Sequence, residues 1–74
     1  MDLTKYYVPD RKRNKTNEER AILLIYGMLT ENIFTPSAVI YRKIREQNIS
    51  ISINFVYRTI KAMREDMLNE LRQH

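Results

Sequence analysis

Four polar side chains that can bind nucleic-acid bases or phosphates recur at helical spacing in the second half of the chain: Asn54, Tyr57, Arg58 and Lys61. Residues three and four positions apart lie on one face of a helix. All four can donate hydrogen bonds, and Arg58 can make a bidentate contact to guanine. We therefore expect a base-reading surface for double-stranded DNA on this face.

The helix that must carry these side chains has an apolar opposite face. Val56, Ile60, Met63 and Met67 follow one another at spacings of four, three and four residues. Such a stripe predicts an amphipathic helix that packs its apolar side onto a core. We expect this helix to begin at Ile53 and to continue through Leu71.

A shorter helix is predicted just before it, from about Pro36 to Gln47, with Thr35 as its N-cap and proline at its first position. Ile40 and Ile44 are one turn apart and should face inward. The turn from Asn48 to Ser52 is brief, so the two helices must cross at a steep angle. This arrangement predicts an all-α, compact three-helix helix-turn-helix domain with an extended third helix.

Two local motifs resemble a known family. Ser-Ile-Asn-Phe-Val-Tyr-Arg at residues 52 to 58 and Thr-Pro-Ser at residues 35 to 37 resemble the openings of the two helices in many helix-turn-helix and winged-helix regulators. The resemblance spans roughly residues 18 to 64. No glycine turn follows the recognition helix, so the wing is absent or vestigial. In that family a serine caps the recognition helix, a valine packs inward, and a tyrosine and an arginine face DNA. By resemblance, Ser52 is the cap, Val56 packs inward, and Tyr57 and Arg58 contact DNA.

The turn has a second interpretation. Isoleucines at 49, 51 and 53 and Phe55 alternate with polar residues, a period of two that by itself predicts a strand. A strand here would suggest a ribbon-helix-helix regulator, but only 19 residues follow Phe55. We therefore favour serine helix caps and isoleucines that fill the core, with the strand as the alternative.

The first predicted helix follows a basic segment and starts at a capping box formed by Thr16 and Glu19. Asn32 should end it in the left-handed conformation. One face is expected to pack into the core through Ile22, Ile25, Tyr26 and Leu29. The apolar residues Leu23, Leu24 and Met28 need a different cover, for which we favour a homodimer interface, with burial by the arm or the C-terminal helix as the alternative. The candidates for that interface are Leu23, Leu24, Met28, Met67 and Leu71.

Basic charge is unevenly distributed along the chain, whose formal net charge is +4. Residues 1–15 and 35–60 each carry +3, whereas 16–34 carry −2 and 61–74 are neutral. We interpret residues 1–15 as a flexible arm that binds phosphates or a minor groove, with a solvated tail as the alternative. Tyr6 is expected in a short strand or packed on the helices. The candidate phosphate contacts are Thr35, Ser37, Arg42, Lys43, Ser52, Arg11, Lys12, Arg13 and Lys15.

Several function classes are disfavoured by the composition. The 74 residues suffice for one domain, residues 16–74, after the arm. There is no cysteine, and His74 is the sole histidine, so we expect no metal site, cofactor or catalysis. No small-molecule ligand is evident. No apolar run could span a bilayer and residues 1–15 do not read as a signal peptide, so a cytoplasmic protein is expected.

These patterns support two hypotheses. The leading one is a small sequence-specific DNA-binding transcriptional regulator, a homodimer that inserts the helix from Ile53 into the major groove. The alternative is an all-helical protein-interaction module that does not bind DNA. The second hypothesis accounts for surplus apolar residues such as Leu23 and Met28 but not for the basic charge near the recognition helix.

Overall fold

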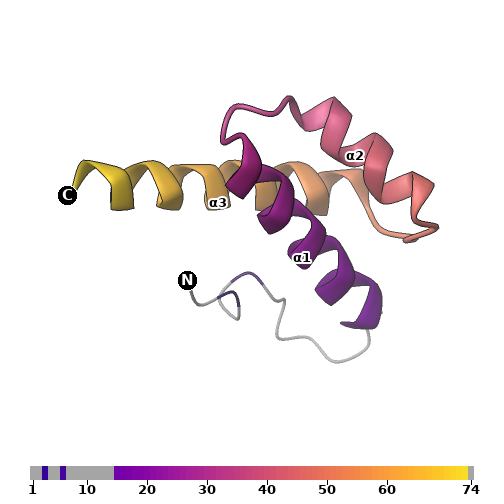
Figure 1. Cartoon of the computed structure of the whole chain (residues 1–74). Coiled ribbons are helices and arrows are strands. Elements are labelled where there is room, and N and C mark those ends of the chain that lie inside the picture. Colours follow the sequence, from indigo (N-terminus) through magenta and orange to yellow (C-terminus); the bar gives the residue numbers. More distant parts are fainter. Residues whose placement is uncertain (1–2, 4–5, 7–14, 74) are drawn as a thin grey trace.

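A computed structural model describes Leu3, Tyr6 and residues 15–73. Three helices follow in order: α1 (Lys15–Glu31), α2 (Ser37–Glu46) and α3 (Ile53–Arg72). The described residues contain no strand, so the all-α three-helix prediction is confirmed and the strand alternative for residues 49–55 is wrong. Both α1 and α2 pack across α3, whose C-terminal half extends beyond them (Figure 1). No helix in this part of the chain is long and apolar enough to cross a membrane.

The ends of α1 differ from the prediction. Thr16 is the second residue of α1, so it does not occupy the N-cap position of a capping box. At the other end, the positive φ predicted for Asn32 is wrong, because the non-glycine residue with positive φ in the described chain is Asn48. The side-chain oxygen of Asn32 instead accepts a hydrogen bond of 3.0 Å from the Phe34 amide and turns the chain.

Helix α2 begins one residue later than expected. Pro36 holds the N-cap position without a side-chain cap, while the Thr35 hydroxyl donates to the Asn32 carbonyl at 2.7 Å. The predicted Thr35 cap is therefore wrong, because that hydroxyl closes the preceding turn. The C-terminal end of α2 is stopped by Asn48, whose φ of 59° is left-handed. Asparagine tolerates this conformation better than most residues, and it allows the Ile49 amide to reach the Ile44 carbonyl at 3.3 Å.

The start of α3 agrees with the prediction. Ser52 is its N-cap, and the serine hydroxyl accepts from the amides of Asn54 at 3.2 Å and Phe55 at 3.5 Å. A cap of this type contributes about 1 kcal/mol to helix stability. The first turn of the predicted recognition helix is thus held by its own sequence.

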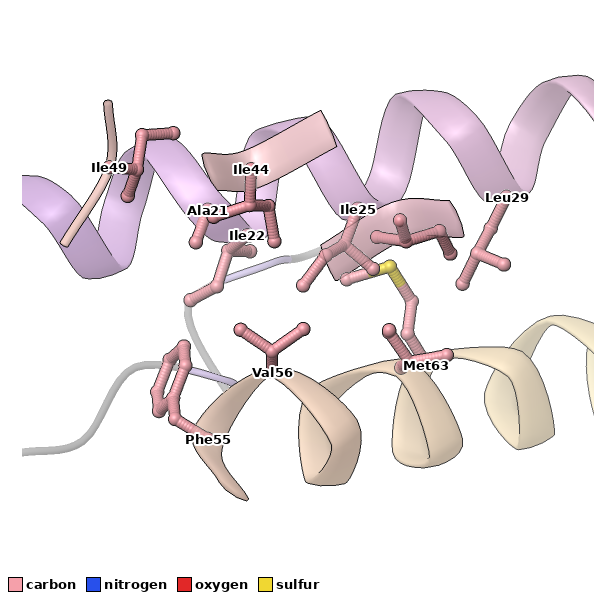
Figure 2. Packing of buried hydrophobic residues seen from close by; sticks show 11 residues of the cluster. Ala21, Ile22, Ile25, Leu29, Ile44, Ile49, Phe55, Val56 and Met63 are labelled. Carbon is pink, nitrogen blue, oxygen red and sulfur yellow. The ribbon is translucent and has the colours of Figure 1, made fainter. Parts of the chain in front are cut away.

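The core lies where the three helices meet. The predicted stripe on α3 is buried at Val56, Ile60 and Met63, and Met67 is half-buried. Val56 and Met63 point toward α1 (Figure 2). The other fully buried apolar side chains are Ala21, Ile22, Ile25, Leu29, Ile40 and Ile44. Apolar contact therefore fixes which side of α3 faces outward.

The isoleucines of the turn do not all fill the core. Ile49 and Phe55 are buried and Ile51 is half-buried, as expected for residues that close the end of the core. Ile53 is 44% exposed, so its predicted role in the core is wrong. The reason is that α3 begins at Ile53, so helical spacing replaces the alternation of a strand.

Both connections between helices are held by side chains from a third element. The Arg64 guanidinium on α3 donates to the carbonyls of Ile33, at 2.7 Å, and Thr35 in the α1–α2 connection. From α1, the Asn17 amide donates to the Ser50 carbonyl at 3.0 Å and Arg20 donates to the Gln47 carbonyl at 3.3 Å. The guanidinium of Arg64 therefore ties α3 to the connection between the other two helices.

Candidate nucleic-acid interface

The four predicted base-reading residues share the outer face of α3. Asn54, Tyr57, Arg58 and Lys61 are all exposed. The residues between them that turn inward are buried, namely Phe55, Val56, Thr59 and Ile60. The prediction that these polar side chains face away from the core is confirmed.

Within this face, Arg58 lies along the helix. Its Nε donates to the Asn54 carbonyl, one turn earlier, at 3.4 Å. This is a long contact to an exposed group, so it directs the side chain toward the beginning of α3 without burying its charge. The guanidinium is accordingly available to a base or a phosphate beside the first two turns.

The row of exposed polar and basic side chains on the outer face of α3 ends at Glu65. Glu65 lies four residues after Lys61, so its exposed carboxylate occupies the same face of α3. A carboxylate repels the phosphates of nucleic acid. The surface suited to an anionic partner is therefore the first half of α3, beginning at the Ser52 cap.

Aromatic side chains join this face to α2. The rings of Tyr41 and Tyr57 meet edge-on, with centroids 6.3 Å apart and planes at 85°. The guanidinium carbon of Arg45 lies 5.9 Å from the centre of the Tyr41 ring, as in a cation–π contact. Arg45 was not among the candidate phosphate contacts predicted from the sequence. Its spacing of four residues from Tyr41 was the sequence signal for this contact.

The candidate phosphate contacts on α2 and its flanks have different environments. Arg42 is exposed, and Lys43 is exposed but 4.0 Å from Glu46, with which it forms an ion pair. Ser37 is half-buried at the start of α2. Thr35 donates its hydroxyl proton within the turn, whereas the Ser52 hydroxyl accepts from two amides and retains its own proton for a partner.

Part of the predicted arm contacts the helices. Leu3 and Tyr6 pack against the core, and the Tyr6 hydroxyl donates to Asp66 Oδ2 on α3 at 2.6 Å. Of the two predictions for Tyr6, packing on the helices is confirmed. The predicted phosphate contacts Arg11, Lys12 and Arg13 lie outside the described residues, as does the side chain of Lys15, the first residue of α1.

The candidate dimer residues do not form one patch. Leu23, which is 56% exposed, and Leu24 line a hollow beside the C-terminal end of α2. Met67 and Leu71 line another hollow with Tyr26 at the projecting end of α3. The fifth candidate, Met28, is half-buried against the core. The structure therefore divides the predicted interface into two separate surfaces.

The environment of Tyr6 changes its acidity. Partial burial, then the hydrogen bond to Asp66 and the negative charges of Asp66 and Glu70, raise the pKa of Tyr6 well above its ordinary value of 10.0. Each of these disfavours the phenolate. The folded state therefore keeps this proton at a pH where the unfolded chain has lost it, so stability is complete below pH ~10 and falls as the pH rises beyond it.

Tyr6→Phe should remove the loss of stability above pH ~10 that comes from ionisation of the tyrosine. Urea unfolding of wild type and variant from neutral pH to above pH ~10 measures it, with Tyr57→Phe as the control for an exposed tyrosine. Wild type and Tyr57→Phe should lose stability more steeply than Tyr6→Phe over this interval. Identical pH profiles for Tyr6→Phe and wild type would contradict the contact with Asp66.

No protein-family model, curated protein or solved structure matches this chain. Among the residues that the structure describes, no group of three or more histidine, cysteine, aspartate or glutamate side chains could hold a metal ion. Among the described residues, the arrangement best suited to binding a ligand is the polar face of α3, together with the contact between Tyr57 and Tyr41 of α2.

Proposed function

We propose that this protein is a small sequence-specific DNA-binding protein, a transcriptional regulator that inserts the first half of α3 into the major groove. The observation that carries the proposal is the division of α3 into a buried apolar face and an exposed face with Asn54, Tyr57, Arg58 and Lys61. The major groove admits an α-helix, and side chains of these types hydrogen-bond to base edges.

The surroundings of α3 support binding to an anionic surface. Helix α2 presents Arg42 and Arg45 to solvent, and its acidic residue Glu46 is paired with Lys43. Contacts from such cations to phosphates position a protein on duplex DNA and make its affinity salt-dependent. In this proposal the basic run at residues 11–13 adds further phosphate contacts.

The proposed regulator resembles helix-turn-helix proteins without a wing. The turn between α2 and α3 and the capped start of α3 support this assignment. Helix α3 continues to Arg72, and Leu71, which is 65% exposed, lies near its end. We assign the half-buried Met67 and exposed Leu71 to a homodimer contact, in a protein that acts in the cytoplasm.

A binding titration tests this function. Fluorescence anisotropy with a random-duplex pool at two salt concentrations should show binding that weakens as salt rises. Selection of the bound sequences should enrich a palindrome with half-sites about 10 bp apart, and the sedimentation mass should be that of a dimer. Absence of binding to duplex DNA at low salt would reject the proposal. If the protein sediments as a monomer and selects a single half-site, the DNA-binding function stands and the homodimer assignment is wrong.

A second function has its own support. Leu23 and Phe34 are exposed large apolar side chains on the side of the molecule formed by α1 and the connection that follows it. Such residues suit an all-helical module that binds another polypeptide. That module would bind its partner with little dependence on salt and would ignore duplex DNA, so the same titration separates the two functions.

A further inference from the structure

An open hollow lies beside the proposed base-reading face, between the C-terminal half of α2 and the turn that leads to α3. Its lining consists of Tyr41, Arg45, Asn48, Ile49, Ser50 and Ile51. No acidic side chain is among these residues. The hollow therefore combines one cation with small polar groups, which suits an anion more than an apolar ligand.

Three lining side chains have unused hydrogen-bonding capacity. Arg45, Asn48 and Ser50 are exposed, and none of their side-chain polar atoms makes a hydrogen bond or ion pair within residues 3, 6 and 15–73. A guanidinium, an amide and a hydroxyl can all donate to phosphate oxygens. Because all three line the same hollow, a phosphate bound there has donors from Arg45, Asn48 and Ser50 beside it.

The backbone beneath these donors is well held. Asn17 and Arg20 of α1 donate to the carbonyls of Ser50 and Gln47, on either side of the left-handed Asn48. A turn fixed in this way loses little conformational freedom when it binds. The backbone that carries Asn48 and Ser50 is accordingly preorganised.

The hollow also borders the proposed base-reading face of α3. Arg45 lies over Tyr41, and the edge contact of Tyr41 with Tyr57 leads directly to the exposed side of α3. A ligand bound by Arg45 would thus adjoin whatever contacts Tyr57. In duplex DNA the backbone phosphates line the edges of the major groove, beside the bases that a helix in the groove contacts.

We propose that this hollow binds one phosphodiester of the DNA backbone, held by Arg45, Asn48 and Ser50, next to the bases contacted by Tyr57 and Arg58. The proposal rests on the proposed function, assigns Arg45 to one particular phosphate, and adds Asn48 and Ser50 to the phosphate-binding residues. The contact sets the position of α3 along the groove, and it contributes affinity that does not depend on base sequence.

Salt titration of single variants tests the assignment. Arg45→Ala should reduce the magnitude of the slope of log K against log salt by about 0.9 for each protomer bound, the value for one phosphate, without changing the selected sequence. Asn48→Gly keeps a residue that tolerates positive φ, and Ser50→Ala removes only a hydroxyl, so each should weaken binding while the domain stays folded. Arg72→Ala removes the same charge from an exposed site at the end of α3 and should retain the wild-type slope.

The outcomes distinguish this inference from the function on which it rests. If wild type binds duplex DNA and Arg45→Ala keeps the wild-type slope, the phosphate site is wrong and the DNA-binding function stands. If wild type does not bind duplex DNA, both fall. If the amide resonances of Asn48 and Ser50 shift with inorganic phosphate while duplex DNA is ignored, the hollow is a small-anion site, which also overturns the proposal.

Discussion

Replacing Arg64 with methionine is expected to lower the free energy of unfolding by about 2–4 kcal/mol, although the substitution adds an apolar side chain at the edge of a core. The guanidinium donates to the carbonyls of Ile33 and Thr35, which lie about thirty residues earlier in the chain. Hydrogen bonds from a charged donor contribute about 1.5–3 kcal/mol each, and their loss leaves two part-buried carbonyls unpaired. Burial of the apolar methionine side chain offsets part of this loss, so the expected net change is smaller than the sum of the two bonds. Urea unfolding monitored by circular dichroism measures the change.

The matched control is Arg42→Met on α2. Arg42 is exposed and makes no side-chain hydrogen bond or ion pair within the described residues, so its replacement should change stability by no more than about 0.5 kcal/mol. Arg64→Lys should fall between wild type and Arg64→Met, because a lysine retains the charge but cannot reach both carbonyls with a planar fork. Equal stabilities of Arg64→Met and Arg42→Met would show that Arg64 does not hold the α1–α2 connection.

Arg58→Ala should weaken binding to the selected DNA sequence by about 1–3 kcal/mol and relax the preference at one base pair. With about 1.4 kcal/mol for each tenfold change, this is roughly 5- to 150-fold in Kd. The side chain is exposed, and its one hydrogen bond in the described chain is the 3.4 Å bond to the Asn54 carbonyl. The fold should therefore tolerate the change, and the loss should be confined to recognition.

Two further variants identify the cause of that loss. Arg58→Lys keeps the charge without the bidentate fork, so it should recover nonspecific affinity but not the base preference. Arg72→Ala removes an equal charge far along α3 and should leave the preference intact. Sequence selection with each variant provides the measurement. An unchanged preference in Arg58→Ala would show that Arg58 does not read a base.

Much of the local structure was predictable from residue spacing. The apolar positions Val56, Ile60 and Met63 determine the buried side of α3, and the same spacing places Asn54 and Arg58 on the exposed side. Helical periodicity depends only on residues that are close together in the chain, so it can be recognised in the sequence before the fold is known. The Ser52 cap is local as well, because its hydroxyl reaches amides only two and three residues away.

Predictions failed where two local options were nearly equal. Thr35 and Pro36 could each precede the first residue of α2, and the Thr35 hydroxyl found a carbonyl in the preceding turn instead. Asn32 and Asn48 are both suited to a helix end, yet only Asn48 has a positive φ in the described chain. Which asparagine adopts it depends on how the following residues pack, and Ile49 is buried immediately after Asn48.

The helical class and the two faces of α3 follow from local spacing, because both depend on contacts between residues three and four positions apart. Packing of the helices brings together the pairs that spacing does not reveal: Arg64 bonds to the α1–α2 connection, Tyr6 bonds to Asp66, and Arg45 and Tyr41 adjoin Tyr57. The first two join residues about thirty and sixty positions apart, and the third joins two helices. Spacing within one helix carries no information about such pairs, since they depend on how whole helices pack around a shared core.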